Sequence, residues 1–293
     1  MKKTNKKKNK NIRGWVMFKF IVVIFFALVS FFASLLFSEK QYTKTAYFAV
    51  FPTTPPFPTL TPTPSPTPSP TPIPGYCLYV PVLMYHHIQP QKMAIEKKQT
   101  ALSVDSGVFD QQMAYVASKY TTISADQLVD ALLYKTALAK NSIVLTFDDG
   151  YRDNFEYAHP IIQKYNLTAH LMLATGLAGG ADYLSWDQIQ QMAGSGRWQI
   201  TNHTWSHYSL GKGNGEKIRY EVQTAQQQIQ NNTGQVTDIF TYPYGTIDGV
   251  DILKSLGIRG AFSTIPGSLQ CDSILYQLRR TRIGNSPLSS YGF

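Results

Sequence analysis

A proline-rich stretch divides the chain and limits where a folded domain can form. Residues 51–75 hold 11 of the 17 prolines, and most of the other positions there are Thr or Ser. Proline removes backbone hydrogen-bond donors, and a segment of this composition cannot form a packed core. We therefore expect residues 38–75 to be an extended spacer that rises about 3.1 Å per residue where it is polyproline-like. The folded domain is expected in residues 76–293.

The segment before the spacer has the features of a membrane anchor. Residues 20–37 are uncharged and mostly apolar, and counting from Trp15 the stretch is long enough to cross a bilayer. The lysine-rich residues 1–14 place the N-terminus in the cytoplasm and the rest of the chain outside. A cleaved signal peptide is the alternative, but its apolar region is normally shorter. We predict an uncleaved signal anchor at residues 15–37.

The net charge of +9 belongs to this N-terminal part. Lysine and arginine dominate residues 2–19, whereas basic and acidic residues balance from Tyr76 onward. A neutral domain lacks the positive surface that binds a phosphate backbone, so we expect no nucleic-acid partner. Nothing in the sequence indicates an obligate protein partner.

Cys77 and Cys271 are the only cysteines and lie near the two ends of the predicted domain. Two cysteines can pair in the oxidising environment outside the membrane. A bridge that closes so long a loop stabilises the fold by several kcal/mol in the chain-entropy model. Two unpaired thiols are the alternative, and we favour the disulfide.

Strand-like and helix-like segments alternate from Tyr76 to Phe293. This alternation predicts an α/β fold with parallel strands and covering helices. With this number of units and no dinucleotide fingerprint, a distorted (β/α) barrel is favoured over an open sheet. The predicted strands are 80–85, 143–147, 169–174, 198–201, 239–242 and 261–262, and the predicted helices are 109–119, 126–134, 157–165, 188–193 and 216–232.

Two adjacent aspartates follow the strand predicted at residues 143–147. Asp148 and Asp149 precede Gly150, at the strand end where parallel α/β folds place their sites. Neighbouring carboxylates repel each other unless a cation or a proton lies between them. Because Asp and Gly also favour turns, this fragment alone leaves a turn and a functional site equally open.

His203 and His207 follow the strand predicted at residues 198–201. Their four-residue spacing is used repeatedly for metal ligation. A lone histidine pair is often structural. Combined with a carboxylate at an equivalent strand end, the pair indicates a catalytic metal site with open coordination positions.

Two further strand ends carry side chains suited to catalysis. In residues 242–245, a proline and a glycine fix a tight turn that can direct a backbone N–H outward, beside aromatic rings suited to sugar stacking. His86 and His87 end the first strand, where a histidine can be an acid–base group or a hydrogen-bonded structural residue. We interpret His159 and His170, which lie in helix- and strand-like runs, as structural.

In this order, the four pieces resemble the polysaccharide deacetylases of the NodB-homology type over essentially all of residues 76–293. Residues 146–150 (TFDDG) are similar to the first family motif, and residues 203–207 (HTWSH) are similar to the second. Residues 242–245 (YPYG) are similar to the third. The opening residues 82–87 (VLMYHH) resemble the branch that includes poly-N-acetylglucosamine deacetylases, in which the histidine acid comes from the N-terminal strand.

The resemblance implies a residue for each part of a metal-dependent mechanism. Asp149, His203 and His207 would hold one divalent metal ion, with zinc favoured and cobalt, nickel or iron as alternatives. Asp148 would be the general base. His86 would be the general acid that protonates the leaving amine.

The resemblance also implies a binding pocket for the acetyl group. The backbone N–H of Tyr244, in the turn that Pro243 fixes, would stabilise the oxyanion. Leu184 and Trp186 resemble the segment that forms the wall of the acetyl pocket. These four residues are the predicted oxyanion and substrate-binding set.

The sequence departs from the family pattern at two places. Many members have an arginine at the position of Thr241, where it orients the catalytic aspartate, and we expect Arg280 to take this role for Asp148. The usual C-terminal histidine motif is absent, so the acid is expected to be His86, with His87 less favoured.

We therefore predict a membrane-tethered, extracytoplasmic hydrolase that removes acetyl groups from an N-acetylated polysaccharide, such as peptidoglycan, poly-N-acetylglucosamine or a chitin-like polymer. An O-acetyl esterase acting on a xylan-type polysaccharide is one alternative. A non-catalytic glycan-binding domain is another, but it would be expected to have lost the base or a ligand. Asp148, Asp149, His203 and His207 are all present, which favours catalysis.

Overall fold

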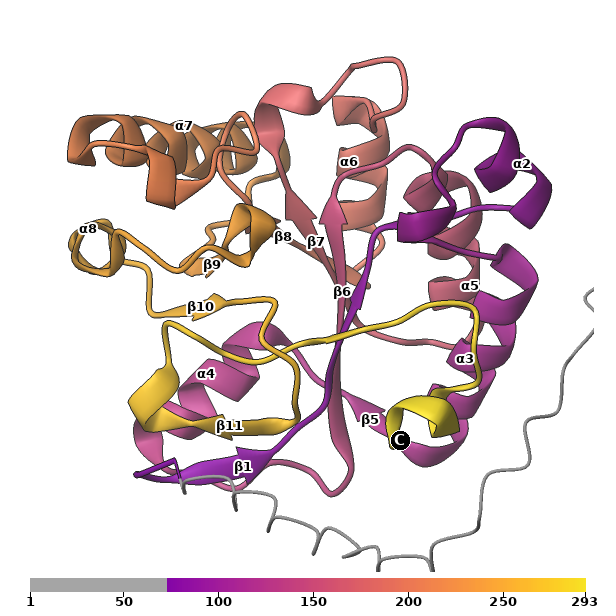
Figure 1. The fold of residues 1–293 in the computed structure, drawn as a ribbon, viewed down its shortest axis with the longest axis horizontal. Coiled ribbons are helices and arrows are strands. Elements are labelled where there is room, and N and C mark those ends of the chain that lie inside the picture. The colour runs from indigo at the N-terminus through magenta and orange to yellow at the C-terminus, as the bar shows by residue number, and fades with distance from the viewer. Residues whose placement is uncertain (1–72) are drawn as a thin grey trace, which may run out of the picture. The chain divides into compact units, whose positions relative to one another are not determined.

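The computed structural model describes residues 73–293 (Figure 1), so the predicted tail, the predicted anchor and most of the predicted spacer lie outside the described residues. Within residues 73–293, no helix combines the length and the apolar character needed to cross a membrane. The strands are β1 (Cys77–Tyr79), β2 (Val82–Tyr85), β3 (His87–Ile88), β4 (Ser103–Val104), β5 (Thr121–Thr122), β6 (Ser142–Asp149), β7 (Ala169–Leu173), β8 (Trp198–Asn202), β9 (Ile239–Thr241), β10 (Gly260–Phe262), β11 (Leu269–Cys271) and β12 (Thr281–Arg282). The helices are α2 (Gln91–Glu96), α3 (Ser106–Lys119), α4 (Ala125–Tyr134), α5 (His159–Lys164), α6 (Trp186–Gly194), α7 (Gly215–Thr233) and α8 (Val250–Ser255).

The main sheet is parallel, as the alternation of strands and helices predicts. Its strand order is β10-β9-β8-β7-β6-β2-β12, with β5 paired beside the start of β6. Every neighbouring pair in this order is parallel. The carboxyl ends of these strands therefore lie along one edge, which is where parallel α/β folds place functional residues.

A short C-terminal segment brings the two edges of the sheet together. Its last residues form β12, which pairs with β2. Leu278, a few residues earlier, forms a bridge with Phe262 of β10, and its N–H donates to Ala261 O at 2.9 Å. The sheet is therefore strongly curled, and residues 278–282 cross its open side. This half-barrel arrangement agrees with the predicted distorted (β/α) barrel.

The side chains of β6 alternate between two environments, as strand geometry requires. Ile143, Leu145 and Phe147 belong to the apolar cluster that packs against α3, α5 and α6. Val144 belongs to a second cluster, which includes Leu128 of α4. Burying an apolar side chain of this size contributes roughly 1.5–3 kcal/mol. The second cluster lies inside the curl of the sheet, on the face of β6 to which Val144 points.

Helices α3, α5, α6, α7 and α8 cover the outside of the curled sheet, whereas α4 packs in the second cluster. Figure 1 shows α3, α5 and α6 on one flank, and α7 and α8 beside β8, β9 and β10 on the other. The capping box predicted at the start of α6 is present, since Gln188 N donates to Ser185 Oγ at 3.2 Å and Ser185 N donates to Gln188 Oε1 at 2.9 Å. Gly234 ends α7 in a left-handed conformation, as expected from its place after the helical pattern.

The central strand is longer than predicted. Residues 143–147 were the expected strand, but β6 continues to Asp149 because Asp148 and Asp149 pair with Met172 and Leu173 of β7. The two aspartates are therefore held by the sheet itself. Their positions are more rigid than those of residues in a flexible turn.

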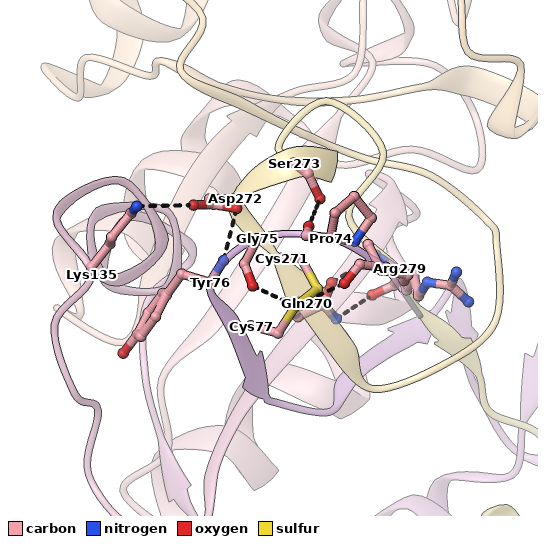
Figure 2. The surroundings of a disulfide bond; sticks show 11 residues. Pro74, Gly75, Tyr76, Cys77, Lys135, Gln270, Cys271, Asp272, Ser273 and Arg279 are labelled. Carbon is pink, nitrogen blue, oxygen red and sulfur yellow. Dashed lines mark hydrogen bonds and ion pairs between the residues drawn. A yellow bond between two sulfur atoms is a disulfide. The ribbon is translucent and has the colours of Figure 1, made fainter. Parts of the chain in front are cut away.

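A disulfide joins the beginning and the end of the domain (Figure 2). Cys77 and Cys271 are partners in the antiparallel β1–β11 pair and are linked across a sequence separation of 194 residues. Next to the bridge, Asp272 Oδ1 accepts a hydrogen bond from Tyr76 N at 3.0 Å, and Asp272 Oδ2 lies 3.7 Å from Lys135 Nζ at the end of α4. The first strand, α4 and the C-terminal segment therefore meet at one corner.

We expect the double substitution Cys77→Ala and Cys271→Ala to lower the free energy of unfolding by roughly 2–5 kcal/mol, because the bridge closes a very long loop in the unfolded chain. Urea unfolding followed by circular dichroism would measure the loss. A reducing agent should destabilise the wild type to the same degree and leave the double variant unaffected. Superimposable unfolding curves for the oxidised wild type and the double variant would contradict the expectation.

Candidate active site

A cavity of about 660 Å³ lies at the carboxyl edge of the sheet. Residues of β2, β6 and β12 contribute to it, together with the loops that follow β2, β6, β8 and β9. Four separate sequence motifs therefore lie around one space. The lining residues are Met84, His86, Leu102, Asp148, Asp149, Tyr151, Leu177, Tyr183, His203, His207, Tyr242, Tyr244, Thr264 and Arg282.

The three predicted metal ligands lie together. Asp149 Oδ1 is 3.4 Å from His203 Nε2 and 3.1 Å from His207 Nε2. One ligand atom from each of the three residues lies within 4.8 Å of the others. Within residues 73–293, Asp149 Oδ1 is buried and has no hydrogen-bond partner. An unpartnered buried carboxylate oxygen beside two imidazole nitrogens fits a divalent cation, and the Asp and His donors are those of catalytic zinc sites.

The backbone directs both aspartates of β6 toward the cavity. Successive residues of a regular strand point to opposite faces. Asp149 has φ 76°, and Gly150 follows with φ 88°, so the strand turns sharply at its end. A side chain at position 150 would be strained by this φ, and its Cβ would lie 2.6 Å from Leu173 Cδ1. The backbone conformation and the contact with Leu173 therefore explain why the first motif has a glycine at position 150.

The neighbours of the histidines orient one of the two rings. His203 Nδ1 contacts Thr241 O at 2.8 Å, so this nitrogen carries the proton and Nε2 is left for a cation. His207 packs edge-on against the Tyr244 ring, with the ring centroids 4.5 Å apart. Burial raises the pKa of Asp149, but the adjacent imidazoles of His203 and His207 outweigh this effect and hold that pKa well below its usual range.

Asp148 is fixed by an arginine from the segment that closes the sheet. Arg280 Nη1 donates to Asp148 Oδ1 at 2.6 Å, and Nη2 donates to Oδ2 at 2.8 Å. Arg280 also donates to Thr146 Oγ1 at 3.1 Å and to Ser263 O at 2.9 Å. Burial raises the pKa of Asp148, but the guanidinium more than offsets this effect and lowers it. The structure therefore places Arg280 against the aspartate that it was expected to orient.

The two adjacent histidines of the first strand have different surroundings. His86 lines the cavity, and its backbone oxygen accepts a hydrogen bond from Asn154 Nδ2 at 2.7 Å. His87 does not line the cavity, since its Nδ1 lies 2.6 Å from Asp153 Oδ2 and its ring stacks on Tyr151. This arrangement favours His86 over His87 as the group that can reach a substrate.

Burial lowers the pKa of His86, and the negative charges of Asp148 and Asp149 oppose this shift. When it is protonated, a buried imidazolium of this kind is a stronger proton donor than a free histidine. Its position in the cavity suits an acid–base group.

The third motif forms the turn that the sequence predicts. Pro243 is buried below it, and Tyr244 has a left-handed backbone with φ 61° and a side chain that is 70% exposed. Gly245 has φ 72°, and a Cβ there would lie 1.9 Å from Thr264 Oγ1. The turn thus brings Tyr244 to the cavity beside His207.

The predicted pocket wall is placed differently. Leu184 is fully buried in the apolar core, and Trp186 begins α6 and packs against the same core. Neither residue is among those that line the cavity. Leu184 N donates to Gly150 O at 2.9 Å, so Leu184 stabilises the turn that follows Asp149. In the structure, Leu177 and Tyr183 provide cavity wall in this region.

Sequence reasoning missed several residues that line the cavity. Tyr151 follows the Asp-Asp-Gly motif directly, and its ring stacks on Tyr183 with centroids 5.2 Å apart. Arg282 lies two residues after Arg280 and adds a positive charge at the edge of the cavity. The adjacency of Tyr151 and Arg282 to predicted site residues was an available signal, whereas nothing in the sequence marked Tyr183.

His159 and His170 lie away from the cavity, consistent with their interpretation as structural. His159 stacks on Phe155 with ring centroids 5.5 Å apart. His170 is fully buried, and its Nε2 accepts a hydrogen bond from Ala125 N at the start of α4 at 2.9 Å. Burial lowers the pKa of His170 to about 3, so this imidazole is neutral in the folded protein at ordinary pH.

The curled parallel sheet thus brings two aspartates and two histidines together at its carboxyl edge. Residues 135–261 match the family model described as polysaccharide deacetylase. The chain therefore carries a polysaccharide deacetylase domain. His86 and Arg280 lie outside the matched residues.

Individual proteins show the same relationship. The chain is 26% identical over 208 residues to YxkH of Bacillus subtilis, covering 70% of this chain and 71% of the relative. It is 25% identical over 203 residues to the poly-β-1,6-N-acetyl-D-glucosamine N-deacetylase of Staphylococcus aureus, covering 62% and 68%. The deacetylase PplD of Streptococcus pyogenes, solved in complex with acetate, is similar with a TM-score of 0.66, 27% identity and coverage of 70% and 92%.

We expect Arg280→Lys to lower kcat/KM for acetate release on the order of 100-fold, because a single ammonium cannot hold both oxygens of Asp148 in place. Arg280→Ala should lose more activity and also destabilise the fold, since it leaves a buried carboxylate unpaired. Steady-state kinetics and circular dichroism would measure both effects.

Arg279→Lys is the matched control, because the adjacent Arg279 guanidinium donates only to Pro266 O outside the cavity. This control should retain wild-type kcat/KM. Unaltered kcat/KM in a folded Arg280→Ala variant would show that Asp148 needs no orienting arginine.

Proposed function

We propose that the protein is a metal-dependent hydrolase that removes acetyl groups from an N-acetylated polysaccharide. The observation that carries the proposal is the convergence of Asp149, His203 and His207 on an unpartnered carboxylate oxygen, beside the Arg280-bound Asp148. These residues would hold one divalent ion, with zinc favoured and cobalt, nickel or iron as alternatives. Such an ion supplies a Lewis acid that polarises the acetyl carbonyl and makes bound water more acidic.

The residues of this chain account for the proton transfers. Asp148 lines the cavity and takes the proton from the attacking water, since each carboxylate oxygen keeps a lone pair beyond its bond to Arg280. The backbone N–H of Tyr244 is the proposed donor to the carbonyl oxygen as negative charge develops there. His86 then gives a proton to the departing nitrogen, because an amine leaves far more readily than an amide anion.

An N-acetylglucosamine polymer is the substrate class that we favour. The family match and the relatives support a deacetylase for polysaccharides, and one relative is named for poly-β-1,6-N-acetyl-D-glucosamine. The exposed ring of Tyr244 offers a surface on which a sugar can stack at the edge of the cavity. Tyr151 and Tyr183 extend this aromatic surface.

We place this activity outside the cytoplasmic membrane. The support comes from the sequence, in which a lysine-rich tail precedes the apolar residues 15–37 and the proline-rich spacer. The Cys77–Cys271 disulfide is consistent with this location, because such bonds persist in oxidising compartments. In this proposal residues 15–37 are an anchor and residues 38–75 hold the domain away from the bilayer. Secretion after signal cleavage is the alternative.

We expect the purified full-length chain to release acetate from at least one N-acetylated glycan in a panel of poly-N-acetylglucosamine, peptidoglycan and chitin oligomers. A chelator should abolish the release, and Zn²⁺ or Co²⁺ should restore it. The variant Asp149→Asn should be inactive under all these conditions, because it removes a charged ligand. Acetate release that persists in the chelator would refute the metal-dependent mechanism.

The variant His86→Gln separates amide from ester hydrolysis. Loss of a general acid should lower the rate on an N-acetylated glycan by roughly 100- to 10,000-fold. The rate on an O-acetyl ester should fall much less, because an alkoxide leaves more easily than an amide anion. His87→Gln is the matched control and should retain the amide-to-ester ratio of the wild type. Equal losses on amide and ester for His86→Gln would remove His86 from the role of acid.

A further inference from the structure

Glu221 is a charged residue in the buried face of α7. The buried positions of this helix are Ile218, Glu221, Val222, Ala225 and Ile229, whose spacing places them on one side of the helix. Glu221 is completely buried. A buried carboxylate is costly unless it is paired and hydrogen-bonded, so packing alone does not explain a glutamate here.

The Glu221 side chain is fully engaged by the loop that carries the histidines. Its Oε2 accepts a hydrogen bond from Ser206 N at 2.8 Å, and its Oε1 accepts one from Ser206 Oγ at 2.8 Å. The backbone oxygen of Glu221 accepts a hydrogen bond from Trp205 N at 3.0 Å. One residue of α7 therefore holds two consecutive residues that lie between His203 and His207.

A second contact from α7 holds the other end of the same loop. Asn202 Nδ2 donates to Val222 O at 2.9 Å, and Asn202 Oδ1 accepts a hydrogen bond from Thr204 N at 2.9 Å. Thr204 and His207 have left-handed backbones, with φ of 67° and 57°. This conformation is unfavourable for non-glycine residues, so it persists only where surrounding contacts impose it.

Lys217 provides the opposite charge for Glu221. Lys217 Nζ lies 2.8 Å from Glu221 Oε1, one helical turn away on α7. The ammonium also lies over the rings of Trp205, Tyr208 and Tyr220, at 5.8, 5.4 and 5.0 Å from their centroids. Cation–π contacts of this kind keep the lysine in place next to the carboxylate. The ion pair and the loop thus form one connected unit.

We infer that Glu221 is a positioning residue for metal binding, which sets the backbone of residues 203–207 so that His203 Nε2 and His207 Nε2 converge on Asp149 before a cation arrives. This inference rests on the proposed metal-dependent function. Glu221 touches neither the cavity nor a ligand atom and acts through Ser206. Contacts that orient metal ligands from outside the coordination sphere typically contribute 10- to 100-fold in metal affinity.

The test is a titration of the purified, metal-free full-length chain with Co²⁺ alone. Calorimetry measures the affinity, and the visible absorption of the bound ion reports its coordination geometry. The wild type should bind one Co²⁺ per chain. Glu221→Gln keeps the shape of the side chain but removes its charge and one acceptor, and it should weaken Co²⁺ binding by about 10- to 100-fold. The absorption band of the bound ion should also change, because the two imidazoles are no longer held in one geometry.

Glu216→Gln is the matched control, since it makes the same change at an exposed position of α7. It should bind Co²⁺ with wild-type affinity and an unchanged absorption spectrum. Thermal unfolding of the metal-free variants separates the two roles of Glu221. A residue that only stabilises the fold would lower the melting temperature and leave the Co²⁺ affinity and spectrum of the folded protein unchanged, which would overturn the inference.

Ser206→Ala provides a second variant in case Glu221→Gln does not fold. It removes the hydroxyl donor, leaves Glu221 paired with Lys217, and should weaken Co²⁺ binding in the same direction but to a smaller degree. Wild-type affinity and spectrum in folded Ser206→Ala would count against the inference. If the wild type itself binds neither Co²⁺ nor Zn²⁺, the proposed metal-dependent function fails. This outcome is distinct from failure of the inference about Glu221, because it is seen in the wild type before any variant is tested.

Discussion

The buried ion pair between Asp148 and Arg280 connects the architecture of the domain to its chemistry. Arg280 is 1% exposed and comes from the segment that crosses the open side of the sheet. A guanidinium in the interior is tolerated only when its donors are satisfied, and here they bond Asp148, Thr146 and Ser263. The same contacts that fasten residues 278–282 to β6 therefore fix the orientation of the proposed base. This ion pair therefore contributes both to the closure of the sheet and to order in the site.

The two adjacent aspartates illustrate how environment separates the roles of identical side chains. Asp148 extends the interior face of β6 and is neutralised by a guanidinium. Asp149 lies after a sharp change in backbone direction and faces two imidazoles, with one oxygen left unpartnered among the described residues. A carboxylate held by an arginine is suited to orient and accept a proton. A carboxylate among imidazole nitrogens is suited to bind a cation.

The proposed metal ligands are supported by the helices outside the sheet as well as by the strands. His203 follows β8 directly, but the loop that ends with His207 leaves the sheet and contains two left-handed residues. Contacts from α7, centred on Glu221, hold this loop. The cavity edge is more open, with aromatic side chains such as Tyr244 exposed. The proposed ligands thus lie beneath an open aromatic edge, as the proposed function on a polysaccharide requires.

The sequence by itself determined the parallel α/β architecture and the residues that gather at the carboxyl edge of the sheet. Strand-end motifs are local, and parallel strands bring their carboxyl ends together whatever the details of packing. The Asp-Asp-Gly and the paired histidines could therefore be found without coordinates. The partnership of Arg280 with Asp148 was suggested only through a family resemblance, since nothing local to residue 280 marks it.

Tertiary structure alone decided which neighbours complete the site. Leu184 and Trp186 were expected at the acetyl pocket, but Leu184 lies in the apolar core and Trp186, at the start of α6, packs against it. His87 turned out to be paired with Asp153, and Glu221 turned out to be joined to Ser206. Each of these contacts joins residues far apart in the chain, or depends on which way a helix faces. Sequence periodicity predicts that a face is buried, but it does not show what that face meets.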